Sequence, residues 1–363
     1  MFGSLTAAAA ALLAAAAAST PVQPASATPA ARPTVTLSGY IQAELDAGAQ
    51  GDTRFPAPDR FFLRRARLTA SGTVLPTLAY RVQVDLAGGL GSASAIAASL
   101  TDGYVEWTRF TAAHVRFGQF KAPFGREWLV QSTQLVTVER TLATDRLTLN
   151  RQIGVTLDGT VQRGAVEYQV GMFNGNGRNT TINDNKRFLY VARGAATAWR
   201  AGSSRLDVGA NAYWSDDTKL SMPAEFGFDS TPQTQASDNL FSGTRRGAGV
   251  DAHFESGPWS ADTELLRIHF TQMAADPLRT SSSTGWYVLP SRYVYRRLIQ
   301  VVGRYERYRP DVAIAGNTTS EWTAGVNYYA RGNTAKVMAD YLWVDTPAPT
   351  GHQKLLVQLQ IIF

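Results

Sequence analysis

The interpretation of the fold depends on residues 117–140, which read FGQFKAPFGREWLVQSTQLVTVER. Up to Phe120, apolar and polar side chains alternate, as they do in a β-strand with one apolar face. Pro123 ends that pattern, because proline has no amide hydrogen to give to a sheet. Residues 121–150 then fit neither a strand nor a tight turn, so their role depends on where the flanking strands lie.

The N-terminal residues have the features of an export signal. Residues 1–27 carry no charge and hold an alanine-rich apolar run that ends in Ala25-Ser26-Ala27, a small-residue cleavage pattern. No basic residue precedes the run, and a flexible alanine-rich leader is the alternative. We therefore predict a signal peptide over 1–27, a short proline-containing linker over 28–33 and one folded unit over 34–363.

The composition limits how this chain could cross a membrane. No stretch of 18 apolar residues follows the leader, so any span would have to be made of strands. The chain also has no cysteine among its 363 residues. An exported chain of this kind must gain its stability from extensive burial or from a closed hydrogen-bonded sheet.

From Thr34 onward, a unit of alternating polarity followed by a turn or loop recurs sixteen times. In the last unit, Leu355, Val357 and Leu359 lie opposite Lys354, Gln358 and Gln360. The predicted strands are 34–45, 60–74, 77–86, 101–110, 113–120, 151–161, 164–173, 187–200, 204–214, 246–255, 258–270, 284–290, 294–309, 320–331, 334–345 and 352–363.

The connections alternate between long and short along the whole chain. The long ones are 46–59, 87–100, 121–150, 174–186, 215–245, 271–283, 310–319 and 346–351. Bacterial outer-membrane barrels have short periplasmic turns and long external loops. Tryptophan and tyrosine near many strand ends suit a lipid–water boundary, although aromatic residues also favour strands in general. The sequence thus predicts an all-β fold, a transmembrane antiparallel β-barrel of about sixteen strands.

Residues 121–150 then form the third external loop. The loop contains Trp128, Leu135, Leu142 and Leu147 among other apolar residues, too many for a segment exposed to water. A barrel of about sixteen strands has a lumen wide enough to admit it. We therefore expect this loop to fold inward and to narrow the channel.

Several motifs resemble the phosphate-selective porin O and P family. They are Gly118-Gln-Phe-Lys-Ala-Pro-Phe-Gly125, Glu127, Gln131-Ser132-Thr133, Val138-Glu139-Arg140 and Arg151-Gln-Ile-Gly154, with Arg65-Ala-Arg67-Leu68, Gly72 and Gln360-Ile-Ile-Phe363. The resemblance is dense over about residues 60–175 and looser beyond. It implies an outer-membrane barrel, usually a homotrimer, that passes small anions such as phosphate. The alternative is a general or differently specific porin with the same fold.

Positive charge gathers where the lumen is expected. Arg65 and Arg67 share a face with Thr69 and Ser71, and the same alternation turns Arg81 and Arg116 inward. The segment 121–151 has five cations against three carboxylates. These cations are Lys121, Arg126, Arg140, Arg146 and Arg151. Such groups attract anions in a channel, but they could also form ordinary wall ion pairs or reach the phosphates of lipopolysaccharide.

Other functions find less support. The four histidines are scattered over separate predicted strands, and no nucleophile motif accompanies them, so we expect neither an enzyme nor a cofactor. The asparagine-rich residues 174–185 could bind a hard cation, but they also suit a plain turn, and we expect no metal. Nucleic acid is not expected as a partner, because the arginines alternate along strands of an exported chain. A non-conducting barrel that serves as adhesin or scaffold remains a further alternative.

Overall fold

The computed structural model describes residues 32–52, 54–55, 59–87, 98–228, 239–273, 279–347 and 352–363. The predicted signal peptide and most of the predicted linker lie outside the described residues. No helix in the described ranges is long and apolar enough to cross a membrane.

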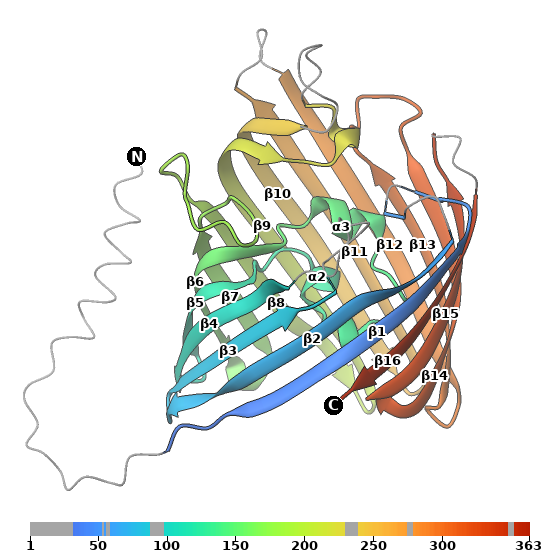
Figure 1. Cartoon of the computed structure of the whole chain (residues 1–363), viewed down its shortest axis with the longest axis horizontal. Helices are drawn as coiled ribbons and strands as arrows, with labels where there is room; N and C mark the ends of the chain where they lie inside the picture. The colour runs from blue at the N-terminus through green and yellow to red at the C-terminus, as the bar shows by residue number, and fades with distance from the viewer. Residues whose placement is uncertain are drawn as a thin grey trace, which may run out of the picture.

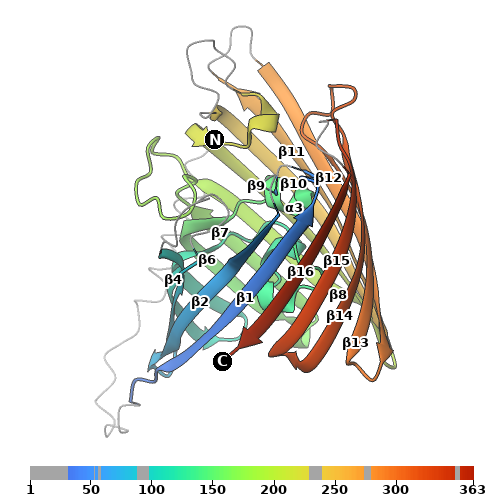
Figure 2. The ribbon, with the colours of Figure 1, turned by 45° about the vertical axis from the view of Figure 1, so that its right-hand side comes forward.

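Sixteen antiparallel strands close into a barrel (Figures 1 and 2). Each strand pairs with its neighbours in sequence, and β1 closes the sheet by pairing with β16, with Tyr40 opposite Ile362. The strands are β1 (Thr36–Gly48), β2 (Arg60–Leu75), β3 (Leu78–Asp85), β4 (Ser99–Phe110), β5 (Ala113–Lys121), β6 (Arg151–Val161), β7 (Val166–Phe173), β8 (Leu189–Ala201), β9 (Ser204–Ser221), β10 (Leu240–Ser256), β11 (Trp259–Gln272), β12 (Arg279–Tyr295), β13 (Ile299–Arg309), β14 (Thr319–Asn333), β15 (Ala335–Asp345) and β16 (Gln353–Ile362). The predicted barrel is confirmed.

The alternation in the sequence becomes an alternation between the two surfaces of the wall. In β14, Glu321, Thr323 and Asn327 are buried in the lumen, whereas Trp322 and Val326 are exposed on the outside. Closure matters because lipid offers no hydrogen-bond partner to an open sheet edge. The closed ring of ladder hydrogen bonds therefore stabilises a chain that has no cysteine to form disulfides.

The prediction for strands twelve and thirteen was wrong. Instead of strands at 284–290 and 294–309, β12 continues to Tyr295, and the chain turns at Arg296 and Arg297. These two arginines have φ values of 41° and 57°, the left-handed conformation that a two-residue hairpin turn needs. Asparagine or glycine usually occupies such positions, so this turn has no recognisable signal in the sequence.

The fifth external connection is shorter than the predicted 215–245. Strands β9 and β10 extend into that range, and Asp217 of β9 pairs with Arg245 of β10 at 2.5 Å. These charges therefore belong to the wall and not to the connection. Asp229 and Asp238, which also fall within the predicted 215–245, lie outside the described residues.

The third external loop, residues 122–150, lies inside the barrel, as predicted (Figure 1). It forms the short helices α2 (Arg126–Leu129), η1 (Ser132–Gln134) and α3 (Leu142–Leu147). Two further 3-10 turns are η2 (Gln162–Gly164) between β6 and β7, and η3 (Ala224–Phe226) in the fifth loop. Both views place α3 inside the barrel, in front of β10 to β12 (Figures 1 and 2).

The first and fifth external loops also enter the lumen, on the side where α3 lies. Phe55 of the first loop packs with Val138 and with apolar side chains of β15 and β16. Phe226 and Phe228 of the fifth loop belong to the same apolar cluster as Leu142 of α3, and both rings contact Phe270 of β11. Loops one, three and five therefore build an apolar core against the wall, mainly on β8 to β16, with Phe120 of β5 and Phe173 of β7 at its edge. The open part of the lumen lies on the other side, along β1 to β7.

Gly285 of β12 lets α3 approach the wall, because a Cβ added there would overlap the Cβ of Ala143. We expect Gly285→Ala to push α3 away and to destabilise the protein by about 1–3 kcal/mol. The midpoint of urea unfolding in detergent checks this. Gly303→Ala on the next strand is the control, since its nearest neighbouring atom would be 4.0 Å away. Equal midpoints for the two variants would contradict the expectation.

Candidate functional site

Carboxylates of the barrel wall hold the third loop in place. Glu264, Glu306 and Asp340 lie on β11, β13 and β15, and all three are buried. Each accepts hydrogen bonds from backbone N–H groups of the loop. The bonds are Arg126 N to Glu264 at 2.5 Å, Glu127 N to Glu264 at 3.2 Å, Val138 N to Asp340 at 2.7 Å and Leu142 N to Glu306 at 2.7 Å. The wall thus supplies acceptors for four N–H groups of a loop that is buried in the lumen.

Cationic side chains from the same side of the barrel bind the carbonyl groups of the loop. Lys336 donates to Leu135 O at 2.7 Å, and Arg304 donates to Glu139 O at 2.7 Å. Arg54 of the first loop donates to Arg140 O at 2.5 Å and also pairs with Glu321. The charges of this half of the lumen are therefore used in fixing the loop.

Two cations hold the third loop in its own shape. Lys121 donates to Trp128 O at 2.6 Å and to Val130 O at 2.9 Å, so it caps the end of α2. Arg140 donates to Glu127 O at 3.1 Å and to Val130 O at 2.7 Å. Burial lowers the pKa of Arg140 to about 10, which leaves the guanidinium protonated at neutral pH. Both residues face the open passage, but their hydrogen bonds are made to the loop.

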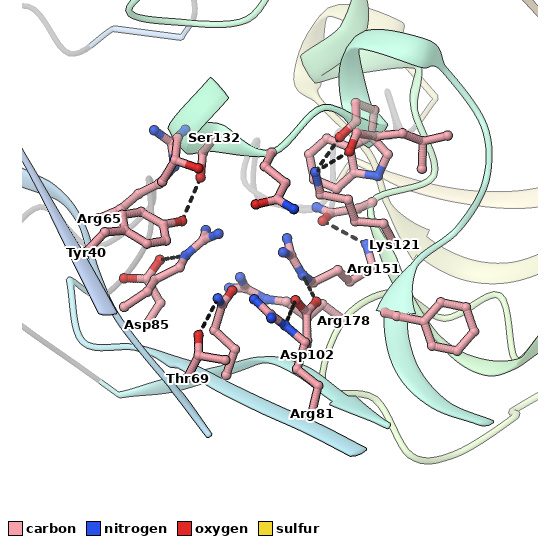
Figure 3. A pocket seen from close by; sticks show the side chains of 18 of the residues that line it. Tyr40, Arg65, Thr69, Arg81, Asp85, Asp102, Lys121, Ser132, Arg151 and Arg178 are labelled. Atoms are coloured by element: carbon pink, nitrogen blue, oxygen red, sulfur yellow. Dashed lines mark hydrogen bonds and ion pairs between the residues drawn. The ribbon is translucent and has the colours of Figure 1, made fainter. Parts of the chain in front are cut away.

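The space left beside the loop is a cavity of about 730 Å³ (Figure 3). Nine cationic side chains and four carboxylates line it. The cations are Arg64, Arg65, Arg67, Arg81, Arg116, Lys121, Arg140, Arg151 and Arg178, and the carboxylates are Asp85, Asp102, Glu139 and Asp145. Nine minus four leaves five positive charges in excess. The cations come mainly from β2, β3, β5 and β6, opposite the wall that holds the loop.

Ion pairs fix several of these guanidinium groups. Arg67 pairs with Asp85 at 2.7 Å. Asp102 lies between Arg151 at 2.8 Å and Arg81 at 3.6 Å. Deeper along β5, Arg116 pairs with Glu106 at 2.5 Å. The acids thus hold the cations in position without matching them in number.

Seven of the nine residues predicted to face the channel line this cavity, and two do not. Arg126 points to the opposite side of the loop, where it pairs with Asp262 at 2.9 Å in a separate cavity of about 500 Å³. Arg146 lies on α3 and pairs with Asp145 and with Glu225 of the fifth loop. The charge sum of the loop could not show these directions, because they depend on how α2 and α3 turn inside the barrel.

Arg64 and Arg178 also line the cavity, and the sequence analysis missed both. A bulge shifts the β1–β2 register after Gln42, so Arg64 and Arg65 both turn inward. Two adjacent arginines in a strand could have revealed this bulge, since one of them would otherwise face lipid. Arg178 lies in the fourth loop, where strand alternation gives no information.

Arg64 ties the third loop to β2 by pairing with Glu139. Burial alone would raise the pKa of Glu139, but the attraction and hydrogen bonds of Arg64 lower it to about 2. The carboxylate is therefore ionised at neutral pH. Arg65, next to it, donates to Gln42 Oε1 at 2.8 Å and lies 3.9 Å from Glu139.

Possible metal ligands gather at one place in the described part of the chain. Glu106, His114 and Asp158 could share an ion, but Arg116 already donates to Glu106 at 2.8 Å. In the asparagine-rich fourth loop, the oxygen of Asn179 accepts a hydrogen bond from Gln119. Both groups have protein partners that account for their positions.

Solved structures with the same fold are outer-membrane proteins. The anion-selective porin of Comamonas acidovorans has a TM-score of 0.65 at 14% identity, with 92% of this chain and 100% of that chain covered. The outer-membrane channel DcaP of Acinetobacter baumannii has a TM-score of 0.65 at 10% identity, with 92% and 98% covered. The loop L8 deletion mutant of OmpT, an outer membrane protein of Vibrio cholerae, has a TM-score of 0.62 at 15% identity, with 92% and 100% covered.

A comparison with curated protein sequences gave no match. The family model for phosphate-selective porin O and P matches residues 36–362, nearly the whole chain. That range contains all sixteen strands and the inward third loop. The chain therefore belongs to the phosphate-selective porin O and P family, and it is an outer-membrane porin.

Proposed function

We propose that the protein is a passive diffusion channel for small anions, with phosphate or related oxyanions as the preferred solutes. The observation that carries this proposal is the lining of the cavity, with nine cations against four carboxylates. Guanidinium groups present paired N–H donors that suit the oxygens of phosphate and carboxylate. An excess of fixed positive charge concentrates anions and repels cations.

The row of cations gives an anion a continuous path along the wall. Arg151 and Lys121 lie opposite each other at the external ends of β6 and β5, and Arg116 lies further toward the periplasmic end of β5. Arg81 and Arg67 lie on the neighbouring strands β3 and β2. An anion can exchange one guanidinium for the next while water stays in contact with it. No energy source or cofactor is needed for such movement.

The N-terminal residues and the outer rim complete the proposal. Residues 1–27 act as the signal peptide that directs export, and residues 28–33 link it to the barrel. In the outer membrane, the long external loops face outward, where their rim meets lipopolysaccharide. The lining residues are not arranged as a nucleophile with its base, so the channel carries out no chemical conversion.

We also propose a homotrimer whose contacts are made by β1 to β5. Eight of the nine exposed tryptophan and tyrosine side chains in the described ranges lie on β8 to β15, and only Trp107 lies on β4. Such residues mark a surface that meets the lipid–water boundary. Strand β3 has 8 residues and β5 has 9, below and at the lower end of the about 9–11 residues with which a strand crosses lipid. Covering this side by neighbouring copies would remove the mismatch.

The sign of the selectivity tests the proposed function. We expect a planar bilayer under a KCl gradient to give the reversal potential of an anion-preferring channel. Arg81→Gln should lower the anion-to-cation permeability ratio roughly two- to fivefold, the factor for about 0.4–1 kcal/mol of Coulomb attraction in water. Arg163→Gln in the exposed turn η2 removes the same charge outside the cavity and should leave the ratio unchanged.

Three results would overturn the proposal in different ways. A cation preference would refute the electrostatic argument. Equal permeability would favour a general porin, and an absence of conductance would favour an adhesin or scaffold. Competition of phosphate with the chloride current then tests the preferred solute.

Lys121→Met should affect the loop more than the selectivity. The change removes the hydrogen bonds to Trp128 O and Val130 O and leaves these carbonyl groups without their donor. We expect a loss of about 1–3 kcal/mol and noisier single-channel currents, because the loop is held less firmly. Urea unfolding and current recordings measure the two effects. An unchanged midpoint with a reduced permeability ratio would show that Lys121 acts on the anion directly.

The proposed trimer surface can be tested with single cysteines, because the chain has none of its own. Leu68 of β2 and Val326 of β14 are each 49% exposed in the isolated barrel. We expect a fluorophore on Leu68→Cys to be shielded from brominated lipids and one on Val326→Cys to be quenched. Equal quenching at both positions would place both surfaces in lipid.

A further inference from the structure

The fourth external loop, between β7 and β8, sends one segment back over the inner wall. Gln119 of β5 and Asn179 bind each other twice, through Asn179 N to Gln119 Oε1 at 2.7 Å and Gln119 Nε2 to Asn179 Oδ1 at 2.8 Å. Asn179 also donates to Ser99 Oγ at 3.0 Å, and Gly177 N donates to Gln152 Oε1 at 2.9 Å. The segment is therefore fixed to the external ends of β4, β5 and β6.

The residues of this segment suit its sharp path. Gly175 and Gly177 both have a φ of 90°, and Asn179 has a φ of 62°. Glycine and asparagine adopt these conformations at lower cost than other residues. Between Gly177 and Asn179, the backbone places Arg178 in the lining of the main cavity, and Figure 3 shows it there with Arg151 and Asp102.

Arg178 brings a positive charge that no neighbouring acid neutralises. Within the described ranges it forms no ion pair. Asp85 and Asp102, the acids of this part of the cavity, already pair with Arg67 and Arg151. Burial, followed by repulsion from Arg151 and Arg67, lowers the pKa of Arg178. The position thus combines a guanidinium on a backbone that its neighbours Gly177 and Asn179 fix with surrounding positive charge.

We propose that Arg178 is an external binding residue for oxyanions, placed by the Gln119–Asn179 pair at the entrance to the cation row. This inference rests on the proposed anion channel and adds a residue that the barrel strands do not supply. An oxyanion that enters from outside meets the guanidinium of Arg178 first. It can then move to Arg151 at the external end of β6. The side chains involved are Arg178 and Arg151, with Gln119 and Asn179 as positioning residues.

The experiment measures the block of the KCl current by inorganic phosphate in oriented bilayers, with phosphate added on one side at a time. For Arg178→Gln, we expect the apparent affinity for phosphate added at the external side to fall about tenfold, the factor for the loss of one charge-assisted hydrogen bond. The affinity for phosphate added at the periplasmic side should change less. A block that is unchanged from the external side would overturn the inference.

Two further variants separate charge from position. Arg187→Gln removes a charge from the same loop at a side chain that is 59% exposed and should leave the block unchanged. Asn179→Gly permits the positive φ but removes the side-chain bonds to Gln119 and Ser99, so it should weaken the external block while keeping every charge. Equal effects of Arg178→Gln and Arg187→Gln would show a general charge effect and refute the inference. A wild-type channel without anion preference would refute the proposed function instead.

Discussion

A loop inside a barrel needs partners for its own peptide groups, because buried N–H and C=O groups without partners cost free energy. The wall provides them. Glu264, Glu306 and Asp340 accept N–H groups of the third loop, and Lys336 and Arg304 donate to its carbonyls. These hydrogen bonds fix the loop to β11–β15, and they occupy the carboxylates of that part of the wall. The positive excess of the passage therefore follows from where the carboxylates are used, as well as from where the arginines are.

The apolar residues of the loops reinforce the same division. Phe55, Val138 and Leu142 would be unfavourable in water, and they pack against the inner side of β10–β16. Apolar packing lacks direction, whereas the hydrogen bonds to the wall carboxylates specify one position of the loop. Together they fix the third loop against this side of the barrel and leave the larger cavity, along β1 to β7, to solutes. The passage therefore has the third loop on one side and the cationic side chains of β2, β3, β5 and β6 on the other.

Much of the fold could be predicted because the two patterns that reveal it, the alternation of side chains and the lengths of the connections, are local in the sequence. Alternation of side chains gives the strands, and the difference between short and long connections gives the orientation of the barrel. The errors arose where a residue departed from the usual local signal. Arg296 and Arg297 occupy a turn without glycine or asparagine, and the bulge at Arg64 breaks the alternation. The directions of Arg126 and Arg146, and the return of Arg178 into the lumen, depend on contacts between distant segments, which a local pattern cannot contain.

The acids that remain in the passage also have a physical use. A channel has to attract its ion and then release it, so an uninterrupted row of free guanidinium groups would hold an oxyanion too strongly. Asp102, between Arg151 and Arg81, reduces the net charge there and holds both side chains toward the passage. Arg151 is buried in its pair, whereas the Arg81 side chain is 33% exposed and stays within reach of a passing ion. The carboxylates mainly fix the positions of the guanidinium groups and weaken the attraction that each guanidinium exerts on an oxyanion. Such an arrangement favours repeated weak contacts over one tight contact.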